Sequence, residues 1–209
     1  MSVTREFPVL ASPSLDPVAT AIVGVPTHPI TLDEFWELDI VDENGWPLCA
    51  ELVDGVVVVS PAPGGPHQSG VMELAVMLAK ACPPGLRVLP GIGWVTAARA
   101  HHTVRIPDVV VVTEQQVRDV RLDAPPVLAV EVVSRRSSLE RDLVTKRREY
   151  AEAGCRNYWV LLPDRPELIR YRLDESGATY VEVGRTVGRR RVRVTDPYPV
   201  TIDLRRLIV

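Results

Sequence analysis

The chain contains 209 residues, with 24 Lys or Arg against 27 Asp or Glu and a formal net charge of −3. This acidic balance excludes a globally basic nucleic-acid coat protein, although it allows a local basic groove. The 3 cysteines form no CxxC pair, and the apolar runs are far shorter than the roughly 20 residues that span a bilayer, so we expect a cytoplasmic protein without a structural zinc site or a membrane segment.

The N-terminal region divides into an arm and the start of a folded domain. Residues 1–27 are rich in proline and small residues, which is typical of a flexible Pro-rich arm. Thr31 and Glu34 then form a capping-box pattern, which predicts a short helix that ends near Leu38. No repeat or internal linker follows, so the sequence predicts one domain over residues 28–209.

A β-hairpin and a helix are expected next. Asp54-Gly55 suits a type I′ turn, because both residues tolerate positive φ. The strands of this hairpin are 50–53 and 56–59. Apolar residues with helical spacing then predict a helix over 68–81, which the prolines and glycine at 83–85 would end.

The remaining chain alternates apolar runs with one helical pattern. The helix is expected over 138–153, with Gly154 as its left-handed stop. The expected strands are 86–96, 104–113, 127–133, 158–162, 168–173, 179–184, 190–194 and 199–202. Strands 104–113 and 127–133 are apolar almost throughout, as strands covered on both faces tend to be. The order of elements therefore predicts a mixed α/β domain.

Two carboxylates interrupt these apolar strands: Asp108 follows Pro107, and Glu131 lies within Leu128–Val133. A carboxylate in a central strand is costly unless it is paired or binds a cation. On neighbouring strands, both side chains could lie on one face and hold a hard divalent ion. The alternative is that each carboxylate pairs with an arginine or lies at a strand end.

Lys146 is one of only two lysines among the 24 cationic residues. At about 100° per residue it projects onto the centre of an apolar helix stripe. The stripe consists of Leu139, Leu143, Tyr150 and Ala153. An inward lysine needs an anionic partner, and Asp108 and Glu131 are the candidates. In the alternative interpretation Lys146 snorkels past the helix edge or pairs only with Asp142.

Several short motifs occur in a defined order along the chain. They are Glu51-Leu52-Val53-Asp54-Gly55, Pro66-His67-Gln68, Pro107-Asp108, Glu131-Val132-Val133-Ser134, Asp142-x3-Lys146-x3-Tyr150-x3-Gly154 and Asn157-Tyr158-Trp159-Val160. This set, from about residue 30 to 205, resembles the Uma2 family of restriction-endonuclease-like proteins within the PD-(D/E)xK nuclease superfamily. The resemblance implies an α/β fold with a restriction-endonuclease-like mixed sheet, flanked by helices and extended by β-hairpins.

The resemblance also implies roles for individual residues. Asp108 and Glu131 match the two motif acids and would be catalytic metal ligands, with the Val132 carbonyl as a third ligand. Val133 occupies the position of the usual superfamily lysine. As in other Uma2-like chains, Lys146 on the following helix would supply the catalytic ammonium group instead.

Four further residues complete the candidate site. Glu51 matches an early glutamate that would complete a second metal position or orient water, although a solvent-facing strand-edge charge explains it equally well. His67 would contact substrate phosphate or, as the simpler interpretation, cap its helix. Arg135 and Arg136 would bind DNA phosphates, unless they belong to an ordinary solvated face.

These observations lead to one functional hypothesis and one competitor. The hypothesis is a Mg²⁺-dependent endonuclease, with Mn²⁺ as a possible substitute, that hydrolyses DNA phosphodiester bonds. A homodimer is expected by analogy, because cutting both strands favours two sites. The competitor is a catalytically inactive nucleic-acid or protein binding module on the same fold.

Overall fold

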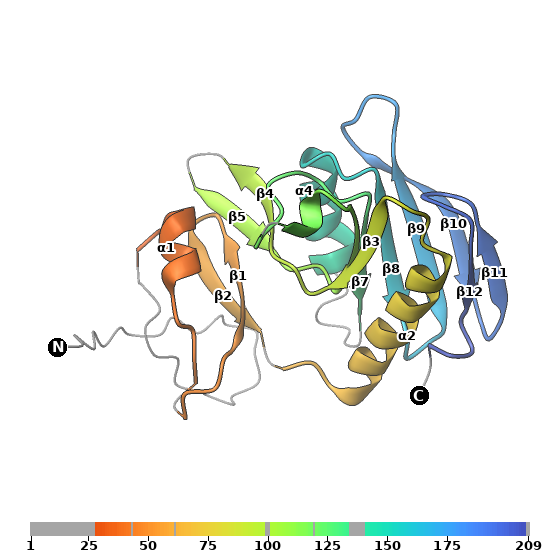
Figure 1. Cartoon of the computed structure of the whole chain (residues 1–209), viewed down its shortest axis with the longest axis horizontal. Helices are drawn as coiled ribbons and strands as arrows, with labels where there is room; N and C mark the ends of the chain where they lie inside the picture. Colours follow the sequence, from red (N-terminus) through yellow and green to blue (C-terminus); the bar gives the residue numbers. More distant parts are fainter. Residues whose placement is uncertain are drawn as a thin grey trace. The chain divides into compact units, whose positions relative to one another are not determined.

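A computed structural model describes residues 28–42, 44–60, 62–98, 101–118, 120–133 and 141–207 (Figure 1). The described chain forms two compact units. The first contains the residues up to Ala62 and Ala97–Arg105, and the second contains Pro63–Thr96 and the residues from Ile106 onward. The predicted arm at 1–27 lies outside the described residues, and the single domain over 28–209 stays a prediction.

The first unit begins with helix α1 (Leu32–Glu37), and its N-terminus confirms the capping box. The Thr31 backbone N–H donates to Glu34 Oε2 at 2.7 Å, and the Glu34 N–H donates to Thr31 Oγ1 at 3.3 Å. These bonds satisfy amides that the first helical turn leaves without partners. Phe35 anchors this short helix, because its side chain is buried.

The predicted hairpin follows as β1 (Cys49–Val53) and β2 (Val56–Ser60). Asp54 and Gly55 have φ values of 50° and 78°, which confirms the expected positive-φ turn. Strand β1 also pairs with β5 (His102–Arg105), in a sheet of order β2-β1-β5-β4. Strand β4 spans Trp94–Ala98, where the chain re-enters the first unit.

The second unit is built on a six-stranded mixed sheet of order β10-β9-β8-β7-β6-β3. Its strands are β3 (Leu86–Pro90), β6 (Val109–Thr113), β7 (Leu128–Val132), β8 (Asn157–Leu162), β9 (Glu167–Leu173) and β10 (Tyr180–Val187). Strands β7 and β8 are parallel, and the other neighbours are antiparallel. Parallel neighbours need a crossover connection, and here the chain between β7 and β8 contains the helix that carries Lys146.

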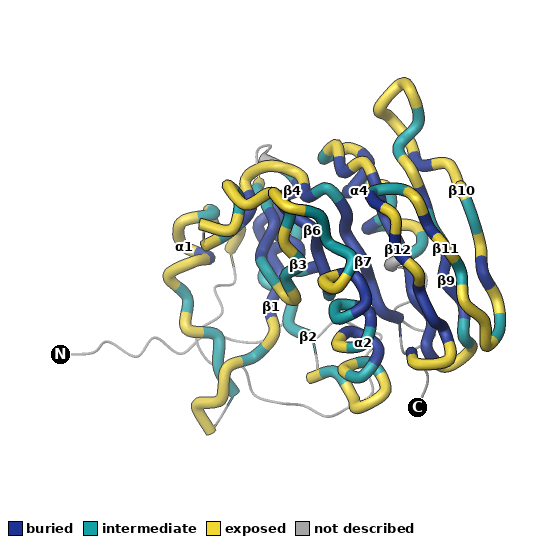
Figure 2. Tube along the Cα trace, turned by 45° about the vertical axis from the view of Figure 1, so that its right-hand side comes forward, coloured by how far each residue is buried: buried dark blue, intermediate teal, exposed yellow. Residues whose placement is uncertain are grey.

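Both faces of this sheet are covered. Helix α2 (Gly65–Ala81) and the hairpin of β11 (Arg191–Val194) and β12 (Val200–Asp203) pack on one face. The crossover helix packs on the other, so that consecutive β6 valines alternate between two cores. Val109–Val112 are 0% exposed, and Figure 2 shows this buried stretch. At about 1.5–3 kcal/mol for each buried valine, burial on both faces explains the apolar strand sequence.

The structure corrects two predicted strands and one helix start. The expected strand 104–113 is divided into β5 and β6, because Pro107 has no N–H and disfavours regular pairing. The expected strand 86–96 is divided into β3 and β4 near Gly91, whose φ is 58°. Helix α2 begins at Gly65 instead of residue 68, since Pro66 fits a first helical turn.

The crossover helix is partly confirmed. Its described part is a π-helical turn, η2 (Arg141–Lys146), followed by α4 (Arg147–Glu152), and Gly154 has the expected positive φ of 81°. Residues 138–140 of the predicted helix lie outside the described residues. A 3₁₀ turn, η1 (Gln116–Arg118), follows β6. Within the described chain, no helix is long and apolar enough to cross a membrane.

Candidate active site

Asp108 lies immediately before β6, at the point where this strand stops pairing with β7. The last paired residues are Val109 and Val130, and Pro107 cannot donate a further strand hydrogen bond. Asp108 Oδ2 instead accepts the backbone N–H of Val132 at 2.7 Å. The carboxylate therefore continues the hydrogen bonding between the two strands beyond their last backbone pair.

Glu131 lies on β7 and points toward the crossover helix, because its neighbours Ala129 and Val133 belong to the core on that face. Its Oε1 atom accepts two hydrogen bonds, from Lys146 Nζ at 3.0 Å and from Tyr150 Oη at 2.6 Å. The side chains of Lys146 and Glu131 are only 4% and 5% exposed. The inward orientation predicted for Lys146 is thus confirmed, and the ammonium does not snorkel to solvent.

The crossover helix positions both donors by its spacing. Lys146 ends η2, and Tyr150 lies four residues later in α4, so both side chains reach the same face. Aromatic packing fixes the Tyr150 ring, whose centroid lies 4.9 Å from that of Trp94 and 5.3 Å from that of Tyr158. The phenol oxygen is therefore held against Glu131 by contacts outside the polar cluster.

Sequence reasoning treated Tyr150 only as part of the apolar stripe and missed its hydrogen bond. The signal that could have found it was its i+4 position relative to Lys146, since two helical residues at this spacing share a target. A buried tyrosine also usually requires a hydrogen-bond partner. The ammonium of Lys146 and the phenol of Tyr150 both donate to one carboxylate oxygen of Glu131. These three groups form a network in which removal of one member affects the others.

His67 approaches Asp108 from α2, with Nε2 located 3.2 Å from Asp108 Oδ1. It does not cap the helix, since Gly64 is the N-cap residue and makes no side-chain cap bond. The other ring nitrogen, Nδ1, is buried without a hydrogen-bond partner among the described residues. The structure therefore replaces the capping interpretation with a direct contact between His67 and a candidate metal ligand.

The sequence also predicted Glu51, Arg135 and Arg136 as site residues. Glu51 belongs to the first unit, where its Oε2 atom pairs with Arg105 Nη1 at 2.9 Å. Both side chains are buried, so that Glu51 is not a solvent-facing edge charge. Its role as a metal ligand stays a prediction. Arg135 and Arg136 lie outside the described residues, and their role as phosphate ligands also stays a prediction.

The donor set around β6 and β7 has the chemistry that Mg²⁺ requires. Asp108 directly precedes Val109, and Glu131 directly follows Val130, the residue that pairs with Val109. The Val132 carbonyl points to the same strand edge as the Val132 N–H that reaches Asp108. Within the described residues, no group of three or more His, Cys, Asp or Glu could hold a metal. Two carboxylates nevertheless fit Mg²⁺, which keeps several waters and often binds through one or two carboxylates.

Comparison with known proteins places this chain in a family. The family model of Uma2, described as "Putative restriction endonuclease", matches residues 32–205. The chain belongs to the Uma2 family. The match includes Asp108, Glu131 and Lys146, and it confirms the family resemblance of the sequence motifs. No curated protein matches the chain.

A solved structure confirms the fold. It is described as a putative nuclease belonging to DUF820 from Anabaena variabilis, and its TM-score with this chain is 0.63 at 17% sequence identity. The alignment covers 86% of this chain and 97% of that one. At this identity the likeness concerns the fold alone. Together, the family and the fold indicate a restriction-endonuclease-like nuclease, built as the mixed α/β structure that the sequence predicted.

Proposed function

We propose that this Uma2 protein is a metal-dependent endonuclease that hydrolyses DNA phosphodiester bonds. The observation that carries the proposal is the buried pair of Lys146 and Glu131, with Glu131 on β7 directly before Val132, whose amide donates to Asp108. A buried ion pair stabilises a fold poorly, because desolvation offsets the attraction between the charges. Such a cluster is therefore more readily explained by chemistry than by packing.

Asp108, Glu131 and the Val132 carbonyl would hold Mg²⁺ or Mn²⁺. The ion would polarise a nonbridging phosphate oxygen and increase the acidity of a bound water. Glu131 is already held in place by two donors on one oxygen, so its position requires little reorganisation when substrate arrives. Asp108 is likewise fixed, through the Val132 N–H and the His67 ring.

Lys146 would stabilise the negative charge that develops on the attacked phosphate. Its ammonium is held 3.0 Å from Glu131 in a site that excludes most water, where a fixed cation is worth more than in bulk solvent. Tyr150 is a positioning residue in this scheme, because it contacts Glu131 and not the reacting atoms. His67 would orient Asp108 and would contact the phosphate of the substrate.

The proposal extends to substrate and assembly. DNA would be bound through its phosphates, with Arg135 and Arg136 following β7 in the sequence as the nearest candidate cations. A homodimer would place two such sites on a duplex, one for each strand. A cytoplasmic location is consistent with the reduced cysteines expected from the sequence.

The test is nicking of supercoiled plasmid DNA with Mg²⁺ or Mn²⁺, compared with EDTA. The informative variants are Asp108→Asn, which keeps an acceptor for the Val132 N–H, and Lys146→Met. Lys80→Met is the matched control, because Lys80 is the other lysine of the chain and is exposed at the end of α2. We expect cleavage by the wild type and by Lys80→Met, and a loss of about 10²-fold or more in the two site variants.

Equal cleavage by all four proteins would refute the assignment. Circular dichroism of each variant must show wild-type structure, so that lost activity is not confused with unfolding. The competing function is a catalytically inactive nucleic-acid or protein binding module on the same fold. For a nucleic-acid binding module, the wild type should bind DNA but should not cleave it with either Mg²⁺ or Mn²⁺.

A further inference from the structure

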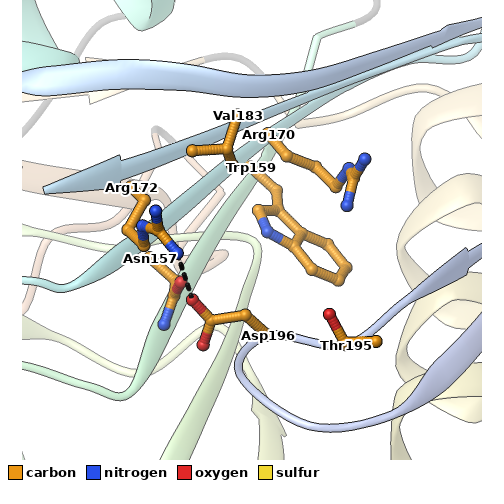
Figure 3. Close-up of a pocket in the computed structure, with 7 residues that line it drawn as sticks. All are labelled: Asn157, Trp159, Arg170, Arg172, Val183, Thr195 and Asp196. Carbon is orange, nitrogen blue, oxygen red and sulfur yellow. Dashed lines mark ion pairs between the residues drawn. The ribbon is translucent and has the colours of Figure 1, made fainter.

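A cavity of about 380 Å³ lies in the second unit between the sheet and the segment that follows β11 (Figure 3). It is lined by Asn157, Trp159, Arg170, Arg172, Val183, Thr195 and Asp196. Trp159 belongs to the core on the α2 face, whereas Glu131 points to the opposite face. Asn157 pairs with Leu128 at the start of β7, and Glu131 lies near the end of that strand. The cavity is thus separate from the candidate active site.

Arg170 contributes a partly buried guanidinium group to this cavity. Its Nε atom is buried and has no hydrogen-bond partner in the part of the chain that the structure describes. Burial lowers the pKa of Arg170 from its usual value, and no neighbouring carboxylate opposes that shift among the described residues. A buried donor left unsatisfied costs about 1–3 kcal/mol, and more when it is charged, so the group requires an explanation.

Gly184 on β10 provides the space that Arg170 occupies. It pairs with Arg170 across the strands, next to a β-bulge between Glu182 and Gly184. A Cβ atom at position 184 would lie 2.9 Å from the Arg170 Cζ and closer still to one terminal nitrogen. The guanidinium therefore lies directly against the bare glycine backbone, in an orientation that any larger residue would block.

Arg172 adds a second cation on the same face of β9, two residues from Arg170. Its Nη1 atom lies 3.8 Å from Asp196 Oδ2, and both side chains are partly exposed, at 48% and 39%. Figure 3 shows this pair as a dashed line, with the Arg170 guanidinium turned away from it. Two arginines and one aspartate leave the cavity with a formal charge of +1.

We propose that this cavity binds a phosphate group, with Arg170 as the principal ligand and Arg172 as the second. Guanidinium groups match the geometry of phosphate oxygens and retain their charge when partly buried. The Thr195 hydroxyl adds a polar group to the same lining. The volume lies within the range of small-molecule sites, which begins at about 300 Å³. The phosphate can belong to a free anion or nucleotide or to a nucleic-acid backbone.

Binding is measured by isothermal titration calorimetry of the full chain with inorganic phosphate, with dAMP and with a short single-stranded oligonucleotide. EDTA is present throughout, so that phosphate cannot bind through a metal at Asp108 and Glu131. The variants are Arg170→Met, Gly184→Ala and Asp196→Asn. Arg189→Met is the control, because Arg189 is exposed and lies outside the cavity.

We expect Arg170→Met and Gly184→Ala to weaken binding about tenfold or more, and Asp196→Asn to strengthen it, because the competing carboxylate is removed. Arg189→Met should bind as the wild type does. Preference for phosphate or dAMP identifies a small anion as the source, and preference for the oligonucleotide identifies a nucleic-acid backbone; either pattern supports the site. No phosphate binding by the wild type, or equal binding by Arg170→Met, overturns it. Plasmid cleavage is not measured in this experiment. If the protein fails to cleave plasmid DNA, the proposal of a phosphate site at Arg170 is therefore unaffected.

Discussion

The buried pair of Lys146 and Glu131 gives the most quantitative prediction. Both side chains are at most 5% exposed, and their charged atoms are 3.0 Å apart. Lys146→Met removes this cation while the carboxylate stays buried, and breaking a buried pair in this way costs about 3–5 kcal/mol. For a chain of this size, 1 kcal/mol corresponds to about 2–4 °C, so we expect the melting temperature to fall by about 6–20 °C.

The double variant Glu131→Gln/Lys146→Met separates the charge effect from lost packing. The introduced amide keeps an acceptor for Tyr150, and no unpaired charge is left behind, so most of the lost stability should return. The assay is equilibrium urea unfolding of the wild type, both single variants and the double variant at pH 7. Lys80→Met again serves as the control, with an expected change within about 0.5 kcal/mol.

A buried ion pair at these two positions requires a coupling free energy of about 2 kcal/mol or more between them. The result to compare is the sum of the changes in unfolding free energy of the two single variants with the change in the double variant. If the two agree to within about 0.5 kcal/mol, the side chains do not form an energetically coupled pair. The geometry on which the catalytic proposal depends would then be wrong in solution.

Two further predictions concern groups outside the candidate site. Arg205 and Arg191 hold the pKa of Asp203 well below its usual value, so Asp203 stabilises the fold above its unfolded pKa of about 4, and this contribution is lost as the pH falls. Asp203→Asn should therefore destabilise the protein at pH 7, and the difference from wild type in urea unfolding should shrink below about pH 4; a constant difference would contradict the assigned cause. Burial raises the pKa of the Cys155 thiol to about 12, whereas Cys49 is exposed. Mass spectrometry after native iodoacetamide labelling should find Cys49 modified and Cys155 modified only after unfolding; labelling of both at similar rates would contradict the burial.

The sequence predicted the features that depend on neighbouring residues. The capping box depends on Thr31 and Glu34, which are three residues apart, and the hairpin turn depends on the dipeptide Asp54-Gly55. Both structures are therefore determined by residues close in sequence. The inward orientation of Lys146 also followed from one helix stripe. The break at Pro107 was visible in principle, but the flanking valines favoured a continuous strand and concealed it.

The contacts across elements were not accessible from spacing. His67 meets Asp108 from a helix 41 positions earlier, and this meeting depends on how α2 packs against the sheet. The pairing of Glu51 with Arg105 depends in the same way on β1 and β5 lying side by side. Within the described chain, the Nε atom of Arg170 has no hydrogen-bond partner because of the way the strands pack around it. No sequence pattern predicts such a cavity.

The hydrogen bond from Val132 to Asp108 has a consequence for side-chain length at position 108. The carboxylate accepts from this amide as a backbone carbonyl does in a regular strand pair, so the length of the side chain decides whether its oxygen meets the amide. Glutamate would carry the same charge one methylene too far and displace the oxygen that meets the amide. The architecture therefore requires the side-chain length of aspartate at this position, whereas the negative charge is required only by the proposed metal. A conservative exchange to glutamate would disturb fold and chemistry together, whereas asparagine, neutral but equal in length, disturbs the chemistry alone.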